Sequence, residues 1–468
     1  MPRVAPKNTP AVLRPMPDPA ADHARRLTRA CELELAIRDR ARPVSDPLEW
    51  ARSGAMALTG PHDAPPRFPC GPLASAARGA GMLLAALAPG TPLEGLDAPA
   101  LLSEHAHAMG LGRRGRISAG GSARLLTTRD ATLALNLPRE EDWRSIPAWL
   151  EVDGPFLHPD DRGRAWRSIG RIVSTRSTED LVARGRLMGL ALAPARRSIP
   201  SDAAPFRLHL ASEHPARPRR RPLRLLDLSS LWAGPLAASL LSMAGIEVLK
   251  VESPTRPDGA RRGPPSFFDL MNGNKAGCAL DLHDPSDRAD FERLLDGADL
   301  VLESARPRAL AQLGFDPAGW LADRPGRIWA SITGHGRRNE WIAFGDDAAM
   351  AAGLAWSPDP DQDDPCFCGD AIADPITGLH LAALVLAHLR KGRGGLLELS
   401  LFECVSHAAS LAAPDPLPAI ERGERGWNVV ESGRPLPVAQ PRMRPVSARA
   451  PALRRPDALL LSHWRSGC

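Results

Sequence analysis

The chain has no tyrosine, and its phenylalanine and tryptophan residues make up only 4% of the 468 residues. Lysine is scarce as well, because only four of the 59 basic residues are lysine and the others are arginine. Proteins that bind single-stranded nucleic acid stack bases on aromatic side chains that lie among basic ones. The net charge of +5 is therefore a weak indication of anionic ligands, and we expect no nucleic-acid partner.

Long apolar runs are missing too. None approaches the roughly 18 consecutive apolar residues of a transmembrane helix, and residues 1–26 lack the apolar stretch of a secretory signal. Of the seven scattered cysteines, Cys366 and Cys368 form a C-x-C pair, but no second pair follows at zinc spacing. We expect reduced thiols and no metal site. These absences predict a cytoplasmic protein with no membrane partner.

Composition and pattern divide the chain into five parts. With 43% apolar and 24% charged residues, the chain has the make-up of a soluble globular protein, and its length suits two or more domains. We expect a flexible Pro/Arg-rich N-terminus with a short helix in 30–40, a smaller α+β part, a basic Pro-rich linker, a larger α/β domain and an extended C-terminal strap. Their respective boundaries are 1–46, 47–210, 211–222, 223–412 and 413–468. Within the α+β part we predict a helix over 72–88 and a strand pair in 122–138.

The larger domain alternates apolar runs with helical patterns. "LRLLDLSS" has strand length, "LWAGP" is a turn, "LAASLLSMAG" is a helix that ends at Gly245, and "IEVLKVE" is a second strand. Strands that are apolar throughout indicate a parallel sheet covered on both faces. The pattern continues with strands at 278–283, 299–304 and 326–334 and helices at 285–298 and 308–314. It predicts a doubly wound, Rossmann-like parallel sheet whose ligands bind beyond the carboxyl ends of the strands.

Two asparagines and one of the four lysines gather in "MNGNKAG", residues 271–277. Asn-Gly favours a tight turn with positive φ. A lysine on such a turn suits a phosphate or another anion, and a solvated hairpin turn is the alternative. The first turn of the domain lacks G-x-G-x-x-G, which disfavours a nicotinamide dinucleotide site.

From about Leu223 to Ser410 the chain resembles the class III CoA-transferases of the formyl-CoA/carnitine type and their relatives, the α-methylacyl-CoA racemases. The resemblance rests on ordered motifs: "LDLSSLWAGPLAASLLSMAGIEVLKVESP", "NGNKAGCALDL", "ADLVLESARP", "LGFDP", "ITGHG", "IADPITGLHLA" and "RKGRGGLLELSLFE". It implies an acyl-CoA:carboxylate CoA-transferase in which Asp374 attacks the thioester and then carries CoA as an aspartyl thioester. The CoA thioester is then a substrate and no cofactor is permanently bound. By position, the implied CoA contacts are Trp232, Ala233, Arg261, Asn272, Asn274, Lys275, Ser304 and Arg306.

The residues around Asp374 allow two interpretations. A carboxylate can act as a covalent nucleophile, and Asp374-Pro375 at a helix start would place it over free backbone N–H groups, with Gly378 keeping that turn open. Such donors could stabilise an oxyanion, by roughly 3–4 kcal/mol each in other acyl-transfer sites. Alternatively, Asp at the N-cap followed by Pro is ordinary capping, which contributes about 1 kcal/mol.

Several departures from the family keep other functions open. Phe344 stands where the racemases have a histidine, and His335, which we expect at the surface, is too far along the chain to replace it. Gln312 stands where an arginine is expected. A catalytically silent acyl-CoA-binding or scaffold protein and a racemase-like enzyme are therefore the alternatives.

Residues 47–210 look like a degenerate partial copy of the catalytic region. "CGPLASAARGAGMLLAALAPG" (70–90) has the rhythm of "CGDAIADPITGLHLAALVLAHLRKG" (368–392), and Ser75 matches Asp374. A serine cannot form the anhydride as a carboxylate does, so we expect this copy to be inactive and to pack against the catalytic half. The chain is then either a homodimer or a pseudo-dimeric monomer.

Overall fold

A seven-stranded sheet lies at the centre of the computed structural model, which describes residues 18–152, 161–200, 203–213, 222–306, 309–410, 416–424 and 426–465. The strands lie in the order β4 (Arg207–Glu213), β10 (Arg393–Ser400), β9 (Ile328–Thr333), β8 (Leu300–Glu303), β5 (Arg224–Asp227), β6 (Glu247–Glu252) and β7 (Ala276–Ala279). Six of them are parallel, and β4 pairs antiparallel with β10 at one edge. The predicted mostly parallel, doubly wound sheet is confirmed.

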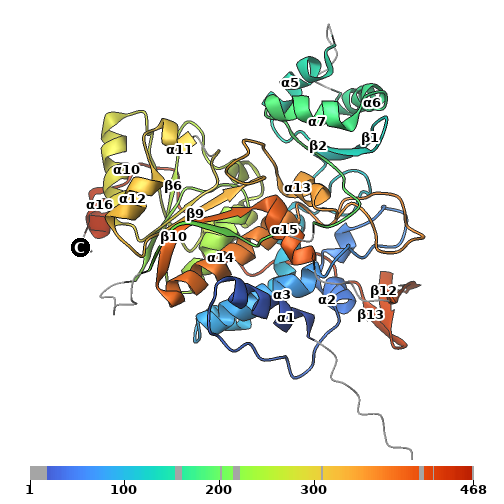
Figure 1. Ribbon diagram of the computed structural model, residues 1–468, viewed down its shortest axis with the longest axis horizontal. Coiled ribbons are helices and arrows are strands. Elements are labelled where there is room, and N and C mark those ends of the chain that lie inside the picture. The colour runs from blue at the N-terminus through green and yellow to red at the C-terminus, as the bar shows by residue number, and fades with distance from the viewer. Residues whose placement is uncertain are drawn as a thin grey trace, which may run out of the picture.

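Helices cover both faces of this sheet (Figure 1). On one face lie α8 (Ala233–Met243) and α14 (Ala373–Lys391), and on the other α10 (Pro285–Gly297), α11 (Ala309–Gln312), α12 (Pro317–Asp323) and α16 (Ala458–Arg465). Successive strand residues serve opposite faces: Leu225 packs in the core with α8 and α14, whereas Leu226 packs with Phe291 and Trp464. Among the described residues, no helix combines the length and the apolar character needed to cross a membrane.

The N-terminal helices share the core of the sheet domain. α1 (Pro19–Ala30), α2 (Asp46–Ser53) and α3 (Leu73–Leu87) lie beside α14 in Figure 1, and Leu27, Trp50 and Leu84 belong to one apolar cluster with α8 and α14. The expected flexibility of 1–46 is therefore wrong for 18–46. The expected helix in 30–40 is also wrong, because residues 31–40 form no helix. The helix of this segment lies earlier in the chain, where Asp18 caps α1 and Pro19 begins it. Residues 1–17 lie outside the described residues.

A smaller α+β unit stands apart at the upper right of Figure 1. Its antiparallel sheet consists of β1 (Ala123–Thr127), β2 (Thr132–Asn136) and β3 (Ala191–Pro194), and it is covered by α5 (Glu140–Leu150), α6 (Arg162–Val173) and α7 (Thr178–Leu187). This unit has its own apolar core around Trp143, Trp149 and Trp166. The predicted hairpin in 122–138 and the helix over 72–88 are confirmed.

One boundary differs from the prediction. β4 extends from the presumed α+β part into the presumed linker, so residues 207–213 belong to the main sheet; residues 214–221 of the linker lie outside the described residues. The C-terminal segment forms a ribbon of β11 (Ala419–Gly423), β12 (Gly426–Glu431) and β13 (Arg434–Pro437), then an extended stretch that ends in helix α16. The remaining helices are η1 (Met56–Leu58), η2 (Pro92–Gly95), η3 (Ala98–Ser103), α4 (Glu104–Met109), η4 (Gly259–Arg262), α9 (Pro265–Asn272), α13 (Gly345–Ala351) and α15 (Leu401–Ala409).

The contact between α1 and α3 depends on Gly79. A Cβ at this position would lie 2.4 Å from the carbonyl oxygen of Ala20, whereas a Cβ at Gly170 in α6 would meet nothing within 4 Å. We expect Gly79→Ala to lower the free energy of unfolding by about 1–3 kcal/mol through overpacking. The same change at Gly170 should raise it by up to about 1 kcal/mol through helix propensity. Urea denaturation checks both, and equal effects of the two substitutions would contradict the close α1–α3 packing.

Candidate active site

Asp374 lies in the first turn of α14 but does not cap that helix. The helix begins at Ala373, its N-cap is Ile372, and no side chain makes the capping hydrogen bond. The backbone N–H of Asp374 donates to the carbonyl of Ala371 at 2.8 Å. The capping interpretation is therefore wrong, and the carboxyl group is available for other contacts.

The Asp374 carboxylate lies close to two backbone N–H groups, those of Ala233 and Gly345, which lower its pKa. These are the first residues of α8 and α13, so three helix starts meet at one carboxylate. A Cβ at Gly345 would lie 2.2 Å from Asp374 Oδ2, so this close approach requires glycine. The donors predicted for Asp374 thus exist, but they belong to other helices. Helix N-termini favour negative charge, which suits an ionised Asp374.

Three further aspartates surround Asp374, and sequence reasoning missed their importance. Asp346 and Asp347 begin α13, and Asp370 lies in the loop before α14; all three are buried. Asp346 accepts from the N–H of Ala371 at 3.0 Å, and Asp347 accepts from Asn136 Nδ2 at 3.2 Å. The run "FGDD" was a signal, but only the fold shows that it lies beside Asp374.

Burial sets the ionisation of this acidic cluster. It raises the pKa of Asp374 to about 7, against the lowering effects of the Gly345 N–H, the charge of His105 and the Ala233 N–H. Burial and the neighbouring Asp370 raise the pKa of Asp346 to about 8. Asp374 therefore ionises near neutral pH, as suits a group that alternates between a nucleophile and a leaving group.

The turn that presents the Ala233 N–H is strained. Leu231 has φ +70°, a left-handed conformation that a leucine rarely adopts. Its N–H donates to Asp258 Oδ1 at 2.9 Å, which fixes the turn from outside. The next residue, Trp232, is 4% exposed and packs against Phe267. Two CoA contacts were predicted in this turn. The Trp232 ring is buried, and the N–H of Ala233 faces Asp374.

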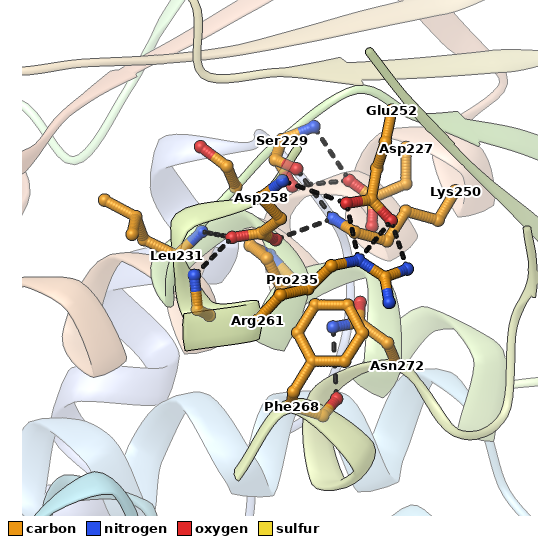
Figure 2. Close-up of polar contacts among 12 residues, drawn as sticks. Asp227, Ser229, Leu231, Pro235, Lys250, Glu252, Asp258, Arg261, Phe268 and Asn272 are labelled. Atoms are coloured by element: carbon orange, nitrogen blue, oxygen red, sulfur yellow. Dashed lines mark hydrogen bonds and ion pairs between the residues drawn. The ribbon is translucent and has the colours of Figure 1, made fainter. Parts of the chain in front are cut away.

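A buried ion-pair network supports this turn (Figure 2). Asp227 and Lys250 are register partners on β5 and β6. Lys250 Nζ lies 2.9 Å from Asp258 Oδ2 and donates to the carbonyl of Ser229 at 2.8 Å. Burial raises the pKa of Asp227, but the charges of Lys275 and Lys250 outweigh it and lower the pKa. The network therefore holds ionised groups, and it ties two strand ends to the loop that carries Asp258.

Lys275 belongs to this network and does not present a free charge. Its ammonium group donates to Asp227 Oδ2 at 2.7 Å, to the Pro235 carbonyl at 3.0 Å and to Asn272 Oδ1 at 2.9 Å, so all three N–H donors are used. Lys275 and Asn272 are both buried. The idea that Lys275 meets a phosphate as a point charge is therefore corrected: this lysine neutralises Asp227.

The predicted positive φ at "NGNK" is also wrong. Asn272 ends α9, and Gly273 has φ −64°. Glycine is required there for a different reason, since a Cβ would lie 2.1 Å from the carbonyl oxygen of Ala448 in the C-terminal segment. Asn274 is exposed, and its side-chain oxygen accepts from Ser447 Oγ at 2.8 Å.

Three predicted CoA contacts follow the carboxyl ends of β6 and β8. Arg261 is held by Glu252, with Nη2 2.6 Å from Oε1, and stacks over the Phe268 ring at 4.3 Å (Figure 2). Ser304 Oγ accepts from the N–H of Ser230 at 3.2 Å. Arg306 is exposed and has no ion-pair partner among the described residues. Arg306 is thus the predicted cation that the fold leaves free to bind an anion.

Gly378, Phe344 and Gln312 were also singled out in the sequence. Gly378 lies inside α14, so the expected turn at this position is wrong; a Cβ there would lie 2.6 Å from the carbonyl oxygen of Ala233. Glycine lets α14 approach the start of α8. Phe344 directly precedes Gly345, and its N–H donates to Asp347 Oδ1 at 3.0 Å. Gln312, at the end of α11, is exposed.

His335 is not the surface residue that we expected. Its ring packs between those of Trp341 and Phe402, and burial, with the charges of Arg186 and Arg196, lowers its pKa to about 4. It stays neutral at physiological pH.

In the presumed copy of the site, the position that matches Asp374 is Ser75. Ser75 is buried in α3, and its N–H donates to Asp46 Oδ1 at 3.0 Å. The N-terminal half nevertheless reaches the catalytic half with a functional group. His105 of α4 lies with Nδ1 2.7 Å from Asp370 Oδ2, and its ring packs against Trp232 and Phe267. No motif pointed to this histidine, because its partners are more than a hundred residues away in the sequence.

The described cysteines are unpaired thiols. The six described cysteines form no disulfide, and Cys366 and Cys368 are both buried. Within the described ranges, no group of three or more His, Cys, Asp or Glu residues is placed to hold a metal ion.

Comparison with known proteins identifies the region around the site. Residues 222–431 match a family model described as CoA-transferase family III. Succinate–glutarate CoA-transferase of Agrobacterium fabrum (strain C58 / ATCC 33970) is 30% identical over 214 residues, which cover 40% of this chain and 53% of that protein. Human succinyl-CoA:glutarate CoA-transferase is 29% identical over 206 residues, or 40% and 47% of the two chains.

A crystal structure of a CAIB/BAIF family protein from Brucella suis aligns with 45% of this chain and 65% of its own, at 25% identity and a TM-score of 0.39. The chain spans about half the length of the curated relatives it matches. The resemblance seen in the sequence motifs is confirmed.

The buried network makes a prediction about Lys275. Lys275→Met should lower the free energy of unfolding by about 3–5 kcal/mol, because it leaves Asp227 charged and unpaired. Adding Asp227→Asn should recover part of the loss. Lys391→Met is the matched control, since Lys391 forms a solvent-exposed pair with Glu32 that water screens. Chemical denaturation measures all four proteins, and similar effects at Lys275 and Lys391 would refute a structural role for the buried lysine.

Proposed function

Since residues 222–431 match the model of CoA-transferase family III, we propose that the protein transfers coenzyme A between carboxylic acids through a covalent intermediate on Asp374. One observation carries this proposal. The Asp374 carboxylate does not cap its own helix and lies close to the N–H groups of Ala233 and Gly345, which begin two other helices. A merely structural aspartate at a helix start would cap that helix.

The reaction begins when an Asp374 oxygen attacks the carbonyl carbon of the acyl-CoA thioester. The C–S bond breaks, which gives a mixed anhydride and the CoA thiolate. The thiolate then attacks the Asp374 carbonyl carbon of the anhydride, so that an aspartyl-CoA thioester forms and the first carboxylate leaves. A second carboxylate attacks this thioester, and the thiolate released attacks the new acyl carbonyl carbon. Asp374 is regenerated and no proton is gained or lost overall.

The two backbone donors fit both roles of Asp374. In the resting enzyme they hold the ionised carboxylate. When the thiolate attacks the Asp374 carbonyl, the charge on the developing oxyanion can be held by the same N–H groups without reorganisation, which is the basis of electrostatic stabilisation in acyl transfer. Because a carboxylate tied to donors is a weaker nucleophile, the raised pKa of about 7 is a compensating feature.

The CoA moiety is placed by this proposal along the carboxyl ends of β5, β6 and β8, close to the turn of Trp232 and Ala233. Arg306 supplies an exposed cation there, and Arg261 remains partly exposed beside its partner Glu252. Arginine binds phosphate with a planar fork of donors. The acids themselves are proposed only as a class, and dicarboxylic acids come first for testing because the relatives named above act on succinate and glutarate.

Covalent chemistry at Asp374 is tested directly by trapping. The protein is incubated with short, branched and dicarboxylic acyl-CoAs, reduced with borohydride and digested. The mass of the peptide that contains Asp374 is then measured by mass spectrometry. We expect reduction at Asp374 with at least one thioester and none in Asp374→Asn, whose exchange rate should fall by roughly 10⁴-fold or more. The trapping rate should rise with pH through about 7, since only the ionised carboxylate attacks.

The same incubation separates the alternatives. CoA binding without reduction at Asp374 in any mixture would favour a silent binding protein. Uptake of deuterium at the α-carbon without CoA exchange would favour a racemase.

Arg306 provides a test of where CoA binds. Arg306→Gln should raise the Kd for CoA by about 10-fold or more, because a charge-assisted hydrogen bond to phosphate is lost. Arg324→Gln is the control, since Arg324 is a half-exposed arginine that precedes β9 at the amino ends of the strands, away from their carboxyl ends. Isothermal titration measures the Kd of both variants. An unchanged Kd in Arg306→Gln would show that Arg306 does not bind CoA.

A further inference from the structure

His105 comes from outside the region that matches the transferase family. It lies on α4, whereas the family match covers residues 222–431. The structure nevertheless brings it to the acidic cluster: Nδ1 is 2.7 Å from Asp370 Oδ2, and the side chain keeps 27% of its surface exposed. The ring centroid lies 5.2 Å from that of Trp232 and 4.8 Å from that of Phe267.

We propose that His105, anchored by Asp370 and stacked on the turn that presents the Ala233 N–H, is a positioning residue that stands as a cation beside Asp374 and keeps that nucleophile ionised. This inference rests on the proposed function, because it concerns the reactivity of the same carboxylate. It also gives the N-terminal half a direct part in the reaction, beyond the packing role expected for an inactive copy.

The charges around His105 support a protonated imidazole. Asp370, Asp374 and Asp346 face it from the loop before α14, from α14 and from α13. Burial lowers the pKa of His105, but the hydrogen bond and the charge of Asp370, with the charges of Asp374 and Asp346, outweigh burial and raise the pKa. The groups from α8 and α9 that touch the ring, Trp232 and Phe267, are uncharged.

Two other acids nearby do not compete for His105. Glu104, its neighbour on α4, is paired with Arg444, whose Nε lies 2.6 Å from Oε1. Asp347 faces Asp374 but accepts hydrogen bonds from Asn136 and from the N–H of Phe344. His105 is therefore the cation that offsets the charge of Asp374.

The pairing with Asp370 also suits the covalent step. Once Asp374 becomes an anhydride or a thioester it is neutral, and a cation that depended on it would lose its counter-ion. Asp370 remains bound to His105 Nδ1 throughout, so the imidazolium keeps a partner while Asp374 changes state. The stacking on Trp232 holds the ring against the Ala233 turn.

The test is the pH dependence of single-turnover trapping at Asp374, with the acyl-CoA that traps best. His105→Gln should move the midpoint upward by about one pH unit, so that the rate at pH 6 falls by about 10-fold while the high-pH plateau stays close to that of the unaltered protein. His105→Lys keeps a cation and should restore the low midpoint. His105→Asn should give the same upward shift, and it carries the test should His105→Gln fail to fold.

His107→Gln is the matched control, because His107 is an exposed histidine on the same helix, with Nδ1 2.9 Å from the Pro441 carbonyl. It should leave the profile unchanged. Equal losses at every pH in His105→Gln and His105→Lys, without a shift of the midpoint, would show a packing role and overturn the inference. An unchanged profile in His105→Gln would also overturn it. If the unaltered protein never becomes modified at Asp374, the proposed function itself fails, which is a distinct result.

Discussion

The approach of two backbone N–H groups, those of Ala233 and Gly345, to the carboxylate of Asp374 is the interaction on which the rest of the site depends. A carboxylate that is half-buried among apolar helices is costly unless donors or charges compensate it. Here the compensation comes from backbone groups that are free because they begin helices. The arrangement works only if three helix starts converge, and the glycines at 345 and 378 allow that close approach.

The convergence is maintained by a buried ion-pair network behind the turn. Lys250 and Asp258 hold the loop whose carboxylate binds the N–H of Leu231, and Leu231 has the strained φ that aims the Ala233 N–H at Asp374. Strain of this kind persists only where surrounding contacts fix it. Lys275 completes the network by neutralising Asp227. Lys275, which looks like an anion-binding group in the sequence, is thus part of the buried scaffold, whereas Arg306 is exposed.

The sequence was sufficient for the architecture of the α/β domain, whose strands and helices follow from apolar runs and turn residues. The motif around Asp374 drew attention to a carboxyl group that the fold places beside Asp346, Asp370 and His105. The sequence could not show which side chains are buried, because Asp227 faces Lys250 only through the register of two strands. It could not reveal His105 either, since its contacts with Asp370, Trp232 and Phe267 depend on the packing of α4 against the catalytic half. The prediction of a flexible N-terminal segment was wrong for a related reason. α1 is polar in composition, and its order depends on its packing against α3.

The central claim, that Asp374 forms a covalent bond with the acids it exchanges, has a direct isotopic signature. When an acceptor carboxylate labelled with ¹⁸O attacks the aspartyl thioester and the thiolate then attacks the acyl carbon, one labelled oxygen stays on the aspartate. Mass spectrometry of the Asp374 peptide after several turnovers should therefore show one and then two heavy oxygens, with no label on Asp346, Asp347 or Asp370. Sustained exchange of CoA with an unlabelled Asp374 would contradict the covalent mechanism.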